Sequence, residues 1–398
     1  MFGFEYYTPT KVVFGKGVES QAGELAKSFG GSRVLIHYGA QSAVRSGLIG
    51  RLEKALDGAG IFHVKLGGVV PNPHLSKIRE GIQLGREHGV DFVLAVGGGS
   101  VIDSAKAIAY GLADAGHDVW DLFAHTRKAS ACLPIGVVLT IAAAGSEMSN
   151  SCVVTDEKTG KKRSYGDNLS RPKFALMNPG LTLTLPDYQT ESGCADIMMH
   201  TMERYFTNGG NMELTDALAE GLLRTVMKCA KTLHKDPQNY GARAEVMWAG
   251  ALSHNGLTGC GSSGGDFATH SLEHELGGMF DVTHGAGLAA IWGSWARYVY
   301  KGCLPRFVKF AQNVMEVEPG GTEEETALKG IAAMESFYRS IGMPTNLEEL
   351  GIAPTEGQIL EMAASCAEAT GGKRGSAKVL YQEDMAAIYR MAQPHGKQ

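Results

Sequence analysis

Residues 91–106 read Asp-Phe-Val-Leu-Ala-Val-Gly-Gly-Gly-Ser-Val-Ile-Asp-Ser-Ala-Lys, and they indicate the architecture of the chain more directly than any other segment. The apolar run at 91–96 predicts a strand buried on both faces, and residues 100–110 predict a helix. The three glycines between them allow the backbone to approach a ligand, and the start of the helix offers free N–H groups. We therefore predict a phosphate-binding loop, although the segment matches neither Gly-x-Gly-x-x-Gly nor the P-loop. The alternative is a tight strand-to-helix turn that Ser100 caps.

Short strands alternate with helices on both sides of this segment. Strands are expected at 33–38, 62–65 and 135–140, and helices at 47–57 and 75–88. Such alternation is typical of a parallel sheet covered by helices on both faces, with ligands bound at the carboxyl ends of the strands. The sequence therefore predicts an α/β dinucleotide-binding domain over residues 1–185.

The pattern changes after Pro186 to long segments with a period of 3.6 residues. The clearest helix is expected at 323–341, where Thr322 and Glu325 form a capping box. Its apolar stripe consists of Leu328, Ile331, Met334, Tyr338 and Ile341. Because no strand is evident beyond Pro186, we predict an all-helical domain over residues 186–398.

Composition excludes several classes of protein. A length of 398 residues favours two domains, and a net charge of −5 argues against nucleic-acid binding. The N-terminus lacks the basic stretch of a signal peptide, and the longest uncharged run, 129–146, contains Pro134. The seven cysteines are scattered without a Cys-x-x-Cys pair, which is typical of reduced thiols. We therefore expect a cytoplasmic protein that binds neither nucleic acid nor membrane.

A carboxylate and several histidines form a candidate metal site. Asp196 and His200 are four residues apart in an expected helix, so both side chains leave from one face. His270 lies in a second such segment, and His284 precedes a glycine. One carboxylate and up to three imidazoles can bind a divalent transition metal if the segments converge. Spacing alone also permits His270 and His274 as a pair, and an ordinary core or surface role is the alternative for each histidine.

Two further loops follow expected strands. The loop from Thr140 to Ser149 contains small residues and hydroxyls that suit a ribose or a nicotinamide. Residues 38–42 follow an earlier strand, where an adenosine ribose would lie, and they include no acid. An acid there would repel a 2′-phosphate, so its absence permits NADP.

Taken together, these motifs resemble the iron-containing (group III) alcohol dehydrogenases, in particular the NADP-dependent butanol dehydrogenases and aldehyde reductases. The resemblance extends over nearly the whole chain, and the order and spacing of its motifs make it specific. The motifs are Pro9-Thr-Lys-Val-Val-Phe-Gly15, Gly97-Gly-Gly-Ser-Val-Ile-Asp103, Gly145-Ser-Glu147, Gly193-Cys-Ala-Asp196-Ile-Met-Met-His200-Thr-Met-Glu203, His270-Ser-Leu-Glu-His274, His284-Gly285 and Gly342-Met-Pro-Thr-Asn-Leu347.

The resemblance implies a dehydroquinate synthase-like fold, with the active site in a cleft between the α/β domain and the helical domain. It implies one divalent metal, Fe²⁺ with Zn²⁺ as the alternative, and a homodimer. The implied ligands are Asp196, His200, His270 and His284. The implied dinucleotide contacts are Gly39, Ser42, Gly97, Gly98, Gly99, Ser100, Asp103, Thr140, Ser149 and Lys162. NADP(H) is favoured over NAD(H).

The expected reaction is metal-dependent transfer of a hydride between NAD(P)(H) and a short-chain primary alcohol or aldehyde. The resemblance places His274 near the substrate rather than on the metal, and we predict that it relays the proton. The alternative for His274 is that it only orients a ligand. Two other functions stay open, namely a glycerol-dehydrogenase-like zinc polyol oxidoreductase and a metal-dependent hydrolase. A hydrolase would leave the glycine-rich loops without a role.

Overall fold

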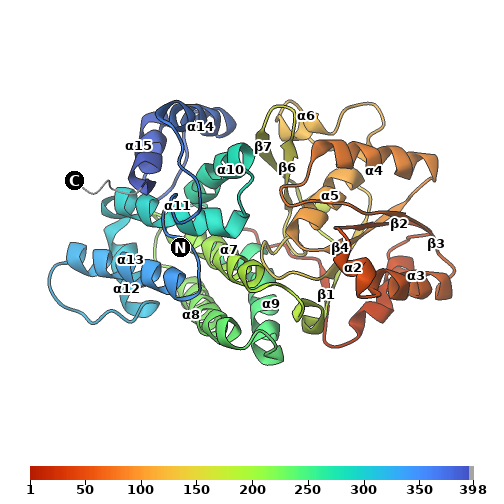
Figure 1. Cartoon of the computed structure of the whole chain (residues 1–398), viewed down its shortest axis with the longest axis horizontal. Helices are drawn as coiled ribbons and strands as arrows, with labels where there is room; N and C mark the ends of the chain where they lie inside the picture. Colours follow the sequence, from red (N-terminus) through yellow and green to blue (C-terminus); the bar gives the residue numbers. More distant parts are fainter. Residues whose placement is uncertain (394–398) are drawn as a thin grey trace. The chain divides into compact units, whose positions relative to one another are not determined.

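A six-stranded parallel sheet forms the centre of residues 7–185, with the strand order β1-β8-β5-β4-β2-β3 (Figure 1). The strands are β1 (Lys11–Phe14), β2 (Arg33–Tyr38), β3 (Phe62–Leu66), β4 (Phe92–Gly97), β5 (Ile135–Leu139) and β8 (Phe174–Met177). Tyr38 of β2 pairs with Val96 of β4, and Gly97 of β4 pairs with Leu139 of β5. These three strands therefore end at one edge of the sheet, where the loops that follow them are neighbours.

Helices cover both faces of the sheet. They are α1 (Ala22–Ser28), α2 (Ser42–Arg45), α3 (Leu48–Gly58), α4 (Leu75–Glu87), α5 (Gly99–Ala113) and α6 (Trp120–Phe123). Val34 and Ile36 of β2 belong to the core that α1 and α3 share, whereas His37, the next residue along the strand, bonds to Ser104 of α5. All six residues of β4 are buried, which explains why this strand reads as an uninterrupted apolar run.

The sequence does not predict four of the strands. β1 and β8 have only four residues each, too few for a periodic pattern. β6 (Ser151–Asp156) and β7 (Lys161–Gly166) form an antiparallel hairpin, with β6 packed on α5. The charges of β7 suggest an exposed loop, but Lys162 and Arg163 are buried in the structure. Tertiary packing, which the local pattern does not show, determines these strands.

Residues from Pro186 onward form a helical unit together with residues 1–6. Its helices are α7 (Asp187–Tyr205), α8 (Glu213–Lys235), α9 (Tyr240–His254), α10 (Ala268–Phe280), α11 (His284–Val299), α12 (Leu304–Asn313), α13 (Glu323–Ser340), α14 (Glu356–Ala369) and α15 (Gln382–Ala392). The computed structural model describes residues 1–393, so the last five residues of the predicted 186–398 domain lie outside the described part. Within that part, no strand follows β8. The predicted fold class is confirmed.

Helix α13 forms where its capping signal and apolar periodicity predict a helix. The capping box between Thr322 and Glu325 is present, and the predicted stripe is buried along most of its length. The exception is Leu328, which is 38% exposed, because the neighbouring Ala327 takes the buried position.

The structure also bears on membrane-spanning helices and on disulfide bonds. In residues 1–393, no helix has both the length and the apolar character needed to cross a bilayer. All seven cysteines lie in this range and none forms a disulfide.

Candidate functional site

The candidate metal site is built on α7, which is buried along most of its length. Asp196 lies near the middle of this helix and is 3% exposed. Helix α11 approaches α7 closely at Gly285, where an added Cβ would overlap the backbone carbonyl of Ser192. Because glycine permits this approach, His284, the first residue of α11, lies beside Asp196. The close packing of α11 on α7 therefore explains why a glycine follows His284.

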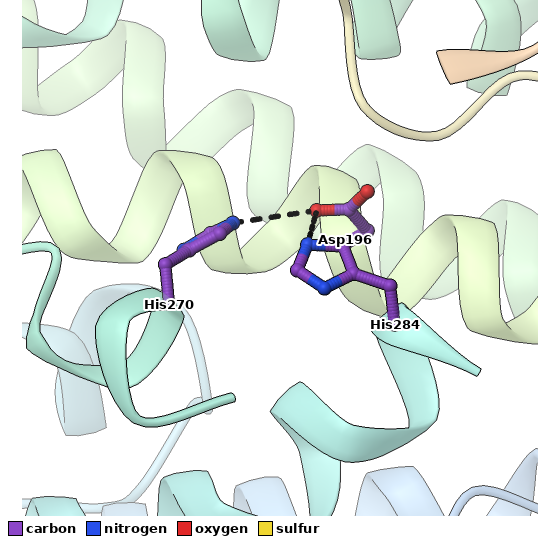
Figure 2. Close-up of side chains that lie close together, drawn as sticks. All are labelled: Asp196, His270 and His284. Atoms are coloured by element: carbon purple, nitrogen blue, oxygen red, sulfur yellow. Dashed lines mark ion pairs between the residues drawn. The ribbon is translucent and has the colours of Figure 1, made fainter. Parts of the chain in front are cut away.

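Three side chains from three helices converge. One ligand atom each from Asp196, His270 and His284 lies within 4.8 Å of the others. The Nε2 atoms of His270 and His284 are 3.5 Å and 3.9 Å from Oδ1 of Asp196. Figure 2 shows the two imidazoles turned toward the same carboxylate oxygen from α10 and α11.

His200 lies against the same carboxylate in a different orientation. Its Nδ1 atom, rather than Nε2, is 3.0 Å from Oδ1 of Asp196. Its ring centroid is 4.4 Å from that of His270 and 4.0 Å from that of His254. Burial lowers the pKa of His200 to about 4, which keeps the imidazole neutral, as a ligand must be. The structure thus places His200 at the site, while its role as a fourth ligand stays a prediction.

The polar atoms at this point fit a cation. Oδ1 of Asp196, Nδ1 of His200 and Nε2 of His270 are buried and have no hydrogen-bond partner among residues 1–393. A buried polar atom without a partner costs about 1–3 kcal/mol, so such atoms seldom gather without a ligand. One carboxylate and several imidazoles are the donors that Fe²⁺ and Zn²⁺ accept.

Two buried glutamates orient the histidines. Glu203, on α7, binds Nδ1 of His270 and accepts a hydrogen bond of 3.1 Å from its backbone N–H. Glu273 binds Nδ1 of His284. Both carboxylates are fully buried. Because Nδ1 of each histidine is bound to a glutamate, Nε2 is the nitrogen that faces Asp196 and can bind a cation once it is deprotonated.

Sequence reasoning missed both glutamates as functional residues. Glu203 has a local signal, since it lies seven residues after Asp196 and three after His200, on one helical face. Glu273 has none, because it lies three residues after His270 yet binds His284 instead. Only the tertiary fold brings Glu273 and His284 together.

The charges at the site depend on one another. Burial opposes ionisation of Asp196, but His200 and His284 outweigh it and hold the pKa of the carboxyl well below its usual range. Burial also disfavours the charged form of His270, but Glu203 and Asp196 outweigh it and raise the pKa of His270 to about 9. A cation that binds here must therefore displace a proton.

His274 lies at the margin of this group. It is half-buried on α10, and its ring centroid is 5.9 Å from that of His284 and 6.5 Å from that of His270. Of two aromatic residues close to these motifs in the sequence, Phe267 lies 5.8 Å from His270, ring to ring, whereas Trp292 is fully buried beside Tyr338. The structure thus places His274 near the imidazoles, and its role in proton transfer stays a prediction.

The predicted cofactor loops meet at one edge of the sheet in residues 7–185. The loops at 39–42, 97–100 and 140–144 follow β2, β4 and β5, which are adjacent strands. Gly39, Gly99 and Thr140 are half-buried at this edge, and Ser42 is exposed. The N-cap of α5 is Gly98 rather than Ser100, and no side chain caps it.

Three other predicted contacts lie behind these loops. Asp103 accepts hydrogen bonds from the Ser146 hydroxyl at 2.6 Å and from the Val153 N–H at 2.9 Å. Ser149 and Lys162 are 1% and 5% exposed. Direct contact with a cofactor stays a prediction for all three residues.

Comparison with known proteins gives matches over nearly the whole chain. The sequence model of "iron-containing alcohol dehydrogenase" matches residues 9–179, and that of "Fe-containing alcohol dehydrogenase family, C-terminal" matches residues 190–393. The NADH-dependent butanol dehydrogenase A of Clostridium acetobutylicum is 38% identical, with 98% of this chain and 99% of that protein covered. The NADPH-dependent aldehyde reductase of Escherichia coli is 35% identical, with 88% and 90% covered. The crystal structure of NADH-dependent butanol dehydrogenase A from Thermotoga maritima superposes with a TM-score of 0.95 at 37% identity, with 99% of both chains covered.

Proposed function

Because the chain belongs to the iron-containing alcohol dehydrogenase family, we propose that it interconverts short-chain primary alcohols and aldehydes at a metal held by Asp196, His200, His270 and His284. Membership of the family makes it an NAD(P)(H)-dependent alcohol dehydrogenase or aldehyde reductase. One observation carries the proposal for the metal site. Buried atoms of Asp196 and His270 face each other without hydrogen-bond partners among residues 1–393, next to an imidazole nitrogen of His284.

The residues of the helical unit have distinct tasks in this reaction. When bound, the metal ion supplies a Lewis acid that stabilises negative charge on the substrate oxygen. Glu203 and Glu273 hold the protons of His270 and His284 on Nδ1, which keeps both Nε2 atoms available. Asp196 contributes a negative charge that burial does not neutralise, because the surrounding histidines keep its pKa low.

Oxidation of an alcohol releases a hydride and a proton. A nicotinamide cofactor held by the glycine-rich loop would supply the hydride acceptor, and we assign the proton to His274, whose half-buried imidazole lies beside His284. From there the proton passes to solvent, and aldehyde reduction follows the reverse course. The alternative, in which His274 only orients a ligand, predicts that a His274→Gln variant loses metal together with activity. Proton relay predicts a normal metal content, a lower kcat and an altered pH profile.

The loop at 39–42 is proposed to choose between the two dinucleotides. It has no carboxylate that would repel a 2′-phosphate, which favours NADP(H). The relative from Clostridium acetobutylicum is named NADH-dependent and the one from Escherichia coli NADPH-dependent, so the family accommodates both. The ratio of kcat/KM for NADPH and NADH measures the preference, and a Gln41→Asp variant should shift this ratio toward NADH.

Family membership favours Fe²⁺ over Zn²⁺, and an alcohol dehydrogenase over the hydrolase alternative. The test is to purify the protein without oxygen, measure its metals by mass spectrometry, and follow the oxidation of NADPH and of NADH by butanal. Activity that chelation removes and Fe²⁺ restores supports the proposal. Cofactor oxidation that persists in metal-free protein would refute it. Restoration by Zn²⁺ alone, with glycerol as the better substrate, would favour the polyol oxidoreductase.

We also propose that the protein acts as a homodimer in the cytoplasm. Met1, Phe2 and Phe4 are each more than half exposed, which is unusual for large apolar side chains and suits a contact between two copies. The seven free cysteines suit a reducing compartment. Light scattering after size-exclusion chromatography measures the oligomeric state, and a monomer at micromolar concentration would refute the dimer.

A further inference from the structure

Lys106 is a charged residue buried completely in the α/β unit. It lies on α5, two turns after the glycines, and its ammonium contacts five oxygens. They are the carbonyl and hydroxyl oxygens of Ser146 at 2.8 and 2.9 Å, those of Ser149 at 3.0 and 3.2 Å, and the carbonyl oxygen of Ser151 at 2.8 Å. An ammonium has three protons, so these acceptors share them. The chain thus surrounds this charge with its own backbone.

Asp103 binds the same segment from the preceding turn of α5. One carboxylate oxygen accepts the Ser146 hydroxyl at 2.6 Å, and the other accepts the Val153 N–H at 2.9 Å. Ser146 therefore connects Asp103 to Lys106. Burial lowers the pKa of Lys106, and the nearby charge of Asp103 opposes that effect. We call Asp103, Lys106 and Ser146 the α5 clamp.

The loop that precedes Ser146 lies against the glycine-rich loop. A Cβ atom added to Gly98 would come within 2.8 Å of Ile141 Cβ, and one added to Gly99 within 2.8 Å of Ala144 Cβ. The loops therefore touch directly at the start of α5, while the α5 clamp joins the same two segments farther along the helix. Residues 141–144 are half-buried, whereas residues 145–149 are buried.

We propose that Lys106 is a positioning residue for the dinucleotide, because the α5 clamp holds the loop at 140–144 in register with the glycine-rich loop. The inference rests on the proposed function, in which both loops contact the cofactor. Asp103, Lys106 and Ser146 act from behind the loops, and the half-buried residues Gly99, Ser100 and 140–144 make the contacts. A loop already ordered in the free enzyme does not have to be ordered when the cofactor binds, which favours affinity.

The consequence is a specific kinetic pattern. Loss of the α5 clamp lets the second loop move, so the dissociation constant of the cofactor rises. The metal ligands belong to the helical unit and are unchanged, so kcat at saturating cofactor stays near the wild-type value. A purely structural role would reduce the amount of folded enzyme and leave the cofactor affinity of the folded fraction unchanged.

The test uses Ser146→Ala, which removes one acceptor of Lys106 and one donor to Asp103 with a small change in volume. Ser104→Ala is the matched control, because Ser104 is also fully buried on α5 but bonds to His37 instead. We expect the dissociation constant of NADH or NADPH, measured by calorimetry on the metal-loaded enzyme, to rise about tenfold in Ser146→Ala only. Its kcat should stay within about twofold, and its metal content should be unchanged. Lys106→Met should give a larger effect, provided that it folds.

The possible outcomes separate the two proposals. A wild-type enzyme that binds neither NADH nor NADPH would refute the proposed function, and this role of Lys106 with it. If the wild type binds cofactor and Ser146→Ala binds it equally well, the positioning role alone is refuted. An equal loss of affinity in Ser104→Ala would also refute it, because the effect would then reflect the general stability of α5.

Discussion

Two buried polar clusters in this chain differ in how far the protein itself satisfies them. At the α5 clamp, the ammonium of Lys106 contacts five oxygens, and both carboxylate oxygens of Asp103 accept hydrogen bonds. At the proposed metal site, Oδ1 of Asp196 and Nε2 of His270 lie side by side, and neither has a hydrogen-bond partner in the described part of the chain. Both clusters are buried, so exposure does not distinguish them.

The difference indicates which cluster binds a ligand. Buried polar groups are normally paired, because an unpaired group loses its hydration without compensation. A cluster that the chain completes is part of the scaffold, whereas one that it leaves incomplete requires an additional group. The first two variants below change the metal site, the third changes the contact between the loops that the α5 clamp joins, and the last changes a buried histidine whose two ring nitrogens are both paired.

The largest effect is expected from His270→Ala. Removal of one Nε2 donor should release the metal and lower kcat/KM at least about 100-fold, because stabilisation of charge on the substrate oxygen is lost. The dissociation constant of NAD(P)H should stay unchanged, since the α5 clamp is intact. Metal content by mass spectrometry and cofactor binding by calorimetry are the measurements. His63→Ala, which removes a half-buried histidine paired with Asp57 in the α/β unit, is the control. A near-normal metal content would remove His270 from the ligand set.

The glutamates behind the histidines should have the next largest effect. In Glu203→Gln and Glu273→Gln, the amide oxygen can still accept the Nδ1 proton, but the negative charge that makes the imidazole more basic is lost. We expect metal affinity to fall about tenfold in each variant, measured by competition with a chelator. Glu220→Gln is the control, because that carboxylate is also buried but binds the Tyr205 hydroxyl. Unchanged affinity in both variants would limit these carboxylates to a packing role.

Gly98→Val probes the contact between the two loops that the α5 clamp joins. The space beside Gly98 is filled by Ile141, so a side chain would separate the two loops rather than only obstruct a phosphate. We expect the KM of the cofactor to rise about tenfold while metal content stays normal. Gly50→Val is a matched control, because no atom lies within 4 Å of a Cβ added there. Equal KM values for the two variants would argue against contact between the loops and the cofactor.

Local pattern predicts much of the fold. The strand, glycine-rich loop and helix at 91–106 appear where the sequence places them, because each is set by neighbours in the chain. The β6–β7 hairpin was missed because β7 begins with Lys161-Lys162-Arg163, and packing of the hairpin overrides that charge. Periodicity therefore predicts elements whose stability is local, and it fails for those that depend on a partner far along the chain.

The same division applies to the site. Helical spacing places Asp196 and His200 on one face, but it treats His270–His274 as an equally good pair. The family resemblance favours His270 with His284, and in the structure the Nε2 atoms of these two lie 3.5 Å and 3.9 Å from Oδ1 of Asp196. Pairs such as Glu273 with His284 and Lys106 with Ser146 cannot be derived from spacing, because α10 and α5 each meet a partner segment through the fold.

The smallest effect on turnover is expected at His37, a histidine whose two ring nitrogens both have hydrogen-bond partners within the protein. Its Nδ1 donates to the Leu66 carbonyl and its Nε2 accepts from Ser104, so in contrast to His270 no nitrogen is left over. Burial lowers the pKa of His37 to about 4, so the unfolded chain binds a proton below pH 6.5 and the folded chain does so only near pH 4. The free energy of unfolding therefore falls as the pH falls through this window.

Between pH 7.5 and 5.5, the free energy of unfolding of the wild type should fall by about 1.4 kcal/mol more than that of His37→Gln, measured by urea unfolding. Loss of the two hydrogen bonds in the variant shifts its stability equally at both pH values, so the slope isolates the titration. An identical slope for both proteins would mean that the folded protein protonates His37 as readily as the unfolded chain does.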